Sequence, residues 1–140
     1  MTRRLIGIGN PDRGDDAAGW EVAAQVTQWQ VSRRTTGSFD MLDIWDENDD
    51  VVIVDAMHSG STPGTVKRFD ARTDELPIGT FASTHSFGPA ALVELARAMD
   101  RLPRTLVVYG IEAGNVDHGA ALSSEVAHAV LQVADELQRA

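Results

Sequence analysis

Two aspartates and one histidine combine the side-chain types of a metal site with positions beside expected strands and helices. Asp16 ends the stretch GIGNPDRGDD at residues 7–16, Asp55 directly follows the apolar run 51–54, and His85 lies in THSFG before an expected helix. Together, two carboxylates and one imidazole would form an O₂N ligand set with open positions, suited to Ni²⁺, Zn²⁺ or Fe²⁺. Asp55 and His85 also have ordinary structural explanations, because Asp55 could cap the next loop and His85 could cap or pack against the helix.

Other site chemistries find little support in the sequence. Gly9 and Gly14 have the spacing of a phosphate-binding loop, but Asp15 and Asp16 stand where that loop needs Lys and then Ser or Thr. Asp12 occupies the position of the last glycine in the dinucleotide fingerprint. The chain also lacks the G-x-S-x-G and H-E-x-x-H motifs of serine hydrolases and zinc peptidases. Asp15 is expected to cap the start of the helix that follows the loop.

The composition of the chain narrows the kinds of site and partner that this protein could have. The 140 residues contain no cysteine, which excludes disulfides and thiolate metal sites. The net charge of −9 argues against nucleic acid as a partner. This negative charge would attract cations or a basic protein partner, or it only keeps the protein soluble. With neither a long apolar span nor the apolar core of a signal peptide, we expect no membrane association and a cytoplasmic location.

Apolar runs and helical periodicity predict an alternation of strands and helices. The expected strands are 5–8, 30–35, 51–54, 65–69 and 106–109, and the expected helices are 15–29, 40–48, 87–100 and one from Ser123 or Ser124 onward. This order predicts a single α/β domain over residues 1–140, with a mainly parallel twisted sheet between helices. The ligand crevice should lie beyond the carboxyl ends of the strands, at residues 10–16, 55–58 and 112–118.

Helical spacing also predicts which side chains are buried. The expected stripes are Leu92, Leu95, Ala96 and Met99 in one helix and Val126, Val130, Val133 and Leu137 in the last. The three tryptophans are expected to pack in the core. Of the other histidines, His128 is expected on the solvent face of the last helix, and His58 and His118 are weaker site candidates.

Several motifs, in order along almost the whole chain, resemble those of the hydrogenase maturation endopeptidases. They are GIGN at 7–10 with GDD at 14–16, VIVDA at 52–56, PGTV at 63–66 with RFD at 68–70, STH at 83–85 and GIE at 110–112. The resemblance implies a five-stranded twisted sheet between helices. It also implies an aspartyl-type endopeptidase that removes a short C-terminal tail from the large-subunit precursor of a [NiFe] hydrogenase after nickel insertion.

The resemblance assigns roles to the three site candidates. It implies that Asp16, Asp55 and His85 contact a nickel ion that the substrate carries, which makes nickel a recognition element. Asp16 or Asp55 could act as general base, or the metal could polarise the scissile carbonyl or the attacking water. A non-enzymatic nickel or large-subunit chaperone with the same residues, and an ordinary zinc peptidase, remain alternatives. A monomer is the default expectation.

One segment departs from the family pattern. Many relatives have Asp-Gly-Gly-Thr after the second strand, whereas this chain has RRTTG at residues 33–37. The change removes a carboxylate and introduces the guanidiniums of Arg33 and Arg34. Because arginine can bind a carboxylate with two parallel hydrogen bonds, we expect this segment to alter how the substrate tail is held.

Overall fold

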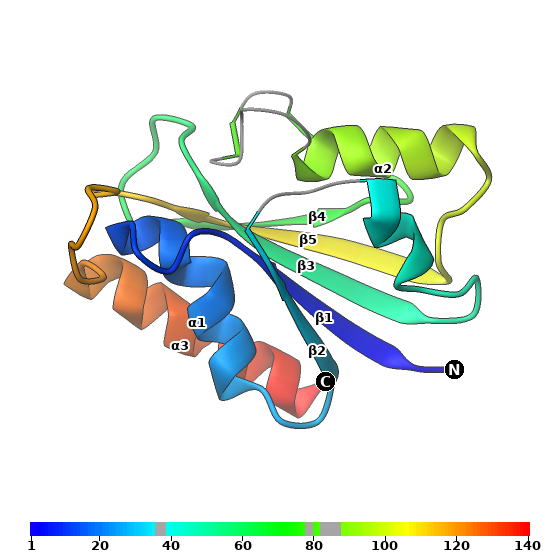
Figure 1. The fold of residues 1–140 in the computed structure, drawn as a ribbon, viewed down its shortest axis with the longest axis horizontal. Coiled ribbons are helices and arrows are strands. Elements are labelled where there is room, and N and C mark those ends of the chain that lie inside the picture. Colours follow the sequence, from blue (N-terminus) through cyan, green and yellow to red (C-terminus); the bar gives the residue numbers. More distant parts are fainter. Residues whose placement is uncertain (36–38, 78–79, 82–87) are drawn as a thin grey trace.

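A five-stranded sheet forms the centre of the molecule in the computed structural model, which describes residues 1–35, 39–77, 80–81 and 88–140. The strands are β1 (Arg3–Ile8), β2 (Gln30–Arg34), β3 (Asp50–Met57), β4 (Val66–Asp70) and β5 (Thr105–Glu112). Their order is β2-β1-β3-β5-β4, and every neighbouring pair is parallel except β4 with β5 (Figure 1). This confirms the predicted α/β fold with a five-stranded, mainly parallel sheet.

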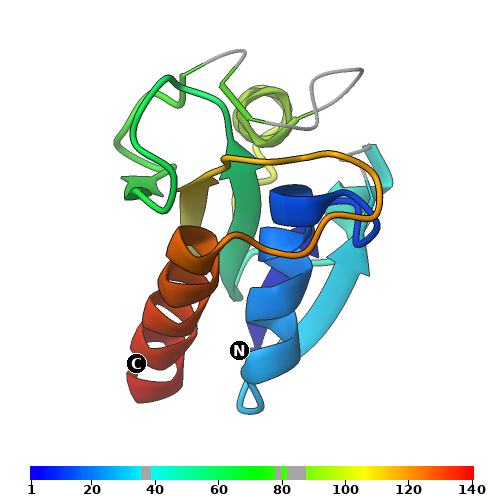
Figure 2. The same cartoon turned by 90° about the vertical axis from the view of Figure 1, so that its left-hand side faces the viewer.

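Helices cover both faces of the sheet. The 3₁₀ helix η1 (Gly14–Ala17) leads into α1 (Ala18–Gln25), which lies with α3 (Ser124–Arg139) on one face. The 3₁₀ helix η2 (Phe39–Asp43) and α2 (Pro89–Ala98) lie on the other (Figures 1 and 2).

Three predicted helices are shorter than expected: the helix predicted over 87–100 is α2, Pro89–Ala98, and the other two differ more. The helix predicted over 15–29 begins as a 3₁₀ turn and ends at Gln25, because Val26 adopts extended backbone and the chain turns toward β2. The helix predicted over 40–48 is only the short η2. After it, the amide of Asp46 donates to the Asp49 carboxylate, which closes a turn in place of further helix.

The sheet separates two hydrophobic cores, and β3 contributes to both. Val51, Ile53 and Met57 pack on the α2 side, whereas Val52 and Val54 pack on the side of α1 and α3. A central parallel strand is buried on both faces, which explains why its sequence is an uninterrupted apolar run.

Most of the helix residues that periodicity predicted as buried are buried in the structure. The predicted stripe of α3 is buried throughout. In α2, Leu92 and Ala96 are buried, but the prediction for Met99 is wrong: it is 52% exposed. The reason is that α2 ends at Ala98, and Asp100 then takes a left-handed backbone conformation with φ 54°.

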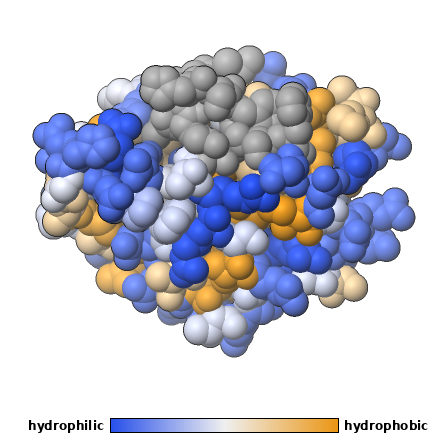
Figure 3. All heavy atoms as spheres, in the orientation of Figure 1, coloured by the Kyte–Doolittle hydropathy of each residue, from blue (hydrophilic) through white to orange (hydrophobic). Residues whose placement is uncertain are grey.

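The three tryptophans differ in how deeply they are buried, and one face of the molecule is largely polar. Trp45 is buried, as predicted, while Trp20 and Trp29 are half-buried. The face seen in Figure 3 is mostly hydrophilic, with apolar residues in separate groups. Among the described residues no helix is long and apolar enough to cross a membrane.

Close backbone contact fixes the start of α1 on the sheet. A Cβ atom added to Gly19 would lie 2.4 Å from the carbonyl oxygen of Val54 and 2.5 Å from that of Ile8. Only a residue without a side chain allows this approach. The first turn of α1, and η1 before it, are therefore held directly over the ends of β1 and β3.

Candidate active site

The carboxyl ends of β1 and β3 define the expected ligand crevice. From β1 the chain crosses to β2 on one side, whereas from β3 it continues toward β5 and β4 on the other. In open α/β sheets, ligands bind at such a reversal, beyond the carboxyl ends of the strands. The loop carrying Asp16 follows β1, and Asp55 belongs to the last part of β3. The fold thus brings two of the three predicted site residues to the same edge of the sheet.

Asp16 lies half-buried in η1, with its carboxylate turned back to the start of the loop. Its Oδ2 accepts a hydrogen bond of 3.1 Å from the amide of Asn10, and its own amide donates to the carbonyl of Arg13 at 2.9 Å. The loop is tight, because a Cβ atom on Gly9 would lie 2.0 Å from the Asp16 carbonyl oxygen. Within the described residues Oδ1 of Asp16 accepts no hydrogen bond, so this oxygen is available to a ligand.

Asp55 is fully buried, with 0% of its surface exposed. Side chains alternate along a strand, so Asp55 faces the α2 side together with Ile53 and Met57. Its Oδ1 accepts a hydrogen bond of 2.8 Å from the amide of Ala56. Burying a carboxylate in the centre of a sheet costs free energy, and such positions are enriched at functional sites. Asp55 therefore carries the strongest structural argument for a site.

His85 lies outside the described residues, so its prediction stays untested. The described segment before it is attached to the end of β3, because Phe81 forms an antiparallel bridge with Met57 and the amide of His58 donates to the carbonyl of Thr80. Described residues resume at Gly88, the N-cap of α2. Among the described residues no three histidine, aspartate or glutamate side chains are grouped closely enough to hold a metal ion.

Asp15 has a structural role other than the predicted one. The prediction that it caps the following helix is wrong, because its fully buried carboxylate crosses to the loop after β5. It accepts hydrogen bonds of 2.8 and 3.0 Å from the amides of Gly114 and Asn115, and further bonds from the amide and hydroxyl of Ser123. Burial acts to raise the pKa of Asp15, but these hydrogen bonds outweigh it and hold the pKa below its usual value.

Glu112 is a further buried carboxylate at this edge, and sequence reasoning gave it no role. It ends β5 and accepts hydrogen bonds from both the amide and the hydroxyl of Ser59. Its backbone also pairs with Gly64 and Thr65. Glu112 thus holds both ends of loop 58–65 against β5. The available signal was an acidic residue at the end of a buried strand, the same signal that singled out Asp55.

The remaining histidines belong to no group of three potential metal ligands in the described part of the chain. His58, His118 and His128 are all exposed. The exposure of His128 confirms its predicted place on the solvent face of α3.

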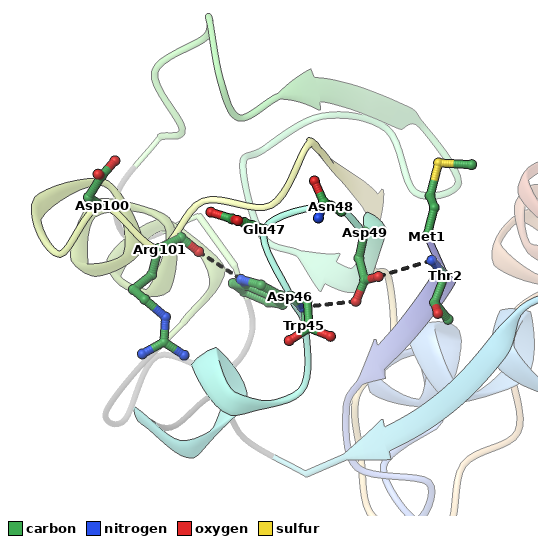
Figure 4. A pocket seen from close by; sticks show the side chains of 9 residues that line it. All are labelled: Met1, Thr2, Trp45, Asp46, Glu47, Asn48, Asp49, Asp100 and Arg101. Carbon is green, nitrogen blue, oxygen red and sulfur yellow. Dashed lines mark hydrogen bonds between the residues drawn. The ribbon is translucent and has the colours of Figure 1, made fainter.

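A hollow of about 530 Å³ lies at the opposite, amino-terminal end of the sheet (Figure 4). Asp49 lines this hollow, but its carboxylate already accepts hydrogen bonds from the amides of Thr2 and Asp46. It also forms an ion pair with Nε of Arg4 at 2.7 Å. The Arg4 guanidinium, followed by the Asp46 amide, lowers the pKa of Asp49 from 3.8 to about 2. Asp49 therefore fixes the first strand in place, and neither Asp16 nor Asp55 lines this hollow.

The fold is that of an α/β protein with two acidic residues, Asp16 and Asp55, at the β1–β3 reversal. A family model described as hydrogenase maturation protease matches residues 23–140. The chain therefore belongs to the hydrogenase maturation protease family, as its motifs predicted, and with that membership it is a peptidase. No curated protein sequence matches the chain.

Solved structures of this family share the fold. The structure is similar to the hydrogenase maturating endopeptidase HybD from E. coli, with a TM-score of 0.81, 20% identity and coverage of 98% of this chain and 90% of that one. It is also similar to the [NiFe] hydrogenase maturation protease HybD from Thermococcus kodakarensis, with a TM-score of 0.75, 23% identity and coverage of 99% and 98%. The endopeptidase HycI from Escherichia coli gives a TM-score of 0.73, 24% identity and coverage of 99% and 90%.

Proposed function

We propose that this peptidase removes the C-terminal tail of a [NiFe] hydrogenase large-subunit precursor after nickel insertion. Membership in the hydrogenase maturation protease family supports the reaction and the class of partner. The observation that carries the assignment of the site is the fully buried Asp55, near the carboxyl end of the central strand. A carboxylate at that depth does not sit in a solvent-facing loop, as a loop cap would, and its oxygens are suitable ligands for a divalent cation.

In this proposal the nickel ion arrives as part of the substrate. Asp16, Asp55 and His85 would complete its coordination, since carboxylate oxygen and imidazole nitrogen both suit divalent nickel. Only a precursor that already holds nickel would then dock productively. Support comes from the half-buried Asp16, whose Oδ2 is fixed by Asn10, and from the attachment of residues 80–81 to the end of β3.

Hydrolysis of the tail requires a group that accepts a proton from the attacking water. We assign this role to one of the two carboxylates, Asp16 or Asp55, because both belong to the crevice edge. The buried hydrogen bonds of Asp15 and Glu112 supply rigidity rather than chemistry.

Intact-protein mass spectrometry tests the assignment. A nickel-loaded precursor is incubated with wild-type protein, with Asp16→Asn, Asp55→Asn and His85→Ala, and with His128→Ala as a control from the exposed face of α3. We expect each of the first three variants to remove the tail more slowly because each loses a proposed nickel ligand, and the variant of the carboxylate that accepts the proton to be at least about one-hundred-fold slower. Wild-type rates in all three would contradict the assignment.

The two alternative functions give different results in the same experiment. A chaperone that uses these residues would bind the precursor stably and leave its mass unchanged. An ordinary zinc peptidase would be isolated with stoichiometric zinc and would cleave a precursor regardless of nickel.

A further inference from the structure

Arg34 stands in the same row of the sheet as Asp55. The register pairs Arg34 with Ile8, and Gly7 with Val54, so Ile8 lies beside Asp55. Residues in one row of a parallel sheet point to the same face, and Ile8 belongs to the core on the α2 side. The side chains of Arg34 and Asp55 therefore rise from the same face at the crevice edge. Two strand spacings separate them, or about 10 Å between their backbones.

The backbone of Arg34 is fixed and its guanidinium is available. Its carbonyl accepts hydrogen bonds of 2.9 Å from the amide of Gly9 and from Nε1 of Trp20. The guanidinium contacts Asp40 through Nη1 at 2.9 Å, and the Asp40 side chain is 61% exposed. A guanidinium has five N–H donors, and within the described residues the other donors of Arg34 make no hydrogen bond. It can therefore bind a second carboxylate without giving up Asp40.

Arg33 carries the same charge as Arg34, but its side chain lies on the opposite face of the sheet. It is two residues from Val31, which packs against the core under α1 and α3, so Arg33 points to that face. It is exposed and forms no ion pair or side-chain hydrogen bond in the described part of the chain. The two adjacent arginines, which the sequence alone treats as one basic segment, are therefore separated by the sheet.

We propose that Arg34 determines substrate specificity by binding a carboxylate of the precursor tail; this rests on the proposed function. An extended peptide advances about 3.3–3.6 Å per residue, so roughly three residues would separate the group held at Asp55 from that carboxylate. The carboxylate is either an acidic side chain of the tail or the free C-terminus of the precursor. Arginine recognises both in the same way, by two parallel hydrogen bonds.

The test compares kcat/KM for cleavage of the nickel-loaded precursor by wild-type protein, Arg34→Gln and Arg34→Glu. Arg33→Gln and Arg33→Glu make the same charge changes on the opposite face and serve as matched controls. We expect Arg34→Glu to lower kcat/KM about ten- to one-hundred-fold, mainly through KM, as for a lost charge-assisted pair. The Arg33 variants should stay within about two-fold of wild type.

Changes in the tail identify the source of the carboxylate. If Arg34 binds an acidic side chain, replacing the Asp and Glu residues of the tail by Asn and Gln should lower kcat/KM for wild-type protein by the same factor as the Arg34→Gln substitution does. The same replacements should cause no further loss of kcat/KM in Arg34→Gln. Synthetic tail peptides with a free or an amidated C-terminus, used as competitors, test the terminal carboxylate. Indifference to both changes would overturn the proposal, as would equal effects of the Arg34 and Arg33 variants.

Failure of the proposed function is distinguishable from failure of this inference. If wild-type protein leaves the precursor uncut, the function is wrong, and fluorescence anisotropy with a labelled tail peptide still tests Arg34. Weaker peptide binding by Arg34→Glu than by Arg33→Glu supports the inference, and equal dissociation constants overturn it.

Discussion

Replacing Asp15 by asparagine should destabilise the fold measurably, although the side chain keeps its size. Oδ2 accepts hydrogen bonds from the amides of Gly114 and Asn115, whereas Oδ1 accepts one from the amide of Ser123. An asparagine would place its NH₂ group at the Oδ1 position, because that choice leaves only one amide, that of the half-buried Ser123, without its acceptor. The Ser123 hydroxyl can rotate to accept from the new donor.

The size of the effect follows from these contacts. A hydrogen bond to a charged group contributes about 1.5–3 kcal/mol, and an unpaired buried amide costs about 1–3 kcal/mol. We therefore expect Asp15→Asn to lower the free energy of unfolding by about 2–3 kcal/mol, and Asp15→Ala by more, because alanine removes every acceptor.

Equilibrium unfolding in urea, followed by circular dichroism, measures the change. Asp12→Asn is the control, because Asp12 is exposed in the same loop, and it should shift the free energy of unfolding by less than about 0.5 kcal/mol. If Asp15→Asn has the same urea midpoint as wild type, and the same dependence of the unfolding free energy on urea, the hydrogen bonds of Asp15 do not hold the loop after β1 to the loop after β5 as we infer.

Two further predictions concern stability. The folded-state pKa of Asp49 is lowered from 3.8 to about 2, so its contribution is complete above about pH 5 and is lost as the pH falls toward 2. Urea unfolding at a series of pH values should therefore give a flatter acid limb for Asp49→Asn than for wild type, and parallel limbs would refute this. Gly19→Ala brings a Cβ atom to 2.4 Å from the Val54 carbonyl. It should cost about 3 kcal/mol or more in thermal or urea unfolding, and a wild-type midpoint would contradict the close packing of α1.

Much of the fold was predictable because burial leaves a strong pattern in the sequence. The apolar run at 51–54 identified the central strand, and the valine stripe of α3 identified its buried face. Helix ends were less predictable, since they depend on local contacts such as the amide of Asp46 bonding to Asp49. Met99 fits a helical stripe by spacing but lies one residue beyond the end of α2.

Some features of the candidate site were also predictable from the sequence, and others were not. The position of Asp55 near the carboxyl end of the central strand was predictable, because it directly follows an apolar run. Sequence could not assign the correct role to Asp15, because its partners at residues 114, 115 and 123 are about one hundred positions away and meet it only in the folded sheet. The separation of Arg33 from Arg34 likewise required the strand register.

The most direct test of the central claim compares one precursor with and without nickel. Wild-type protein is incubated with nickel-loaded and nickel-free large-subunit precursor, and intact mass is followed over time, with Asp55→Asn in parallel. We predict loss of the tail mass only from the nickel-loaded precursor and only with wild-type protein. Equal cleavage of both forms, or full cleavage by Asp55→Asn, would contradict recognition of substrate-borne nickel at this site.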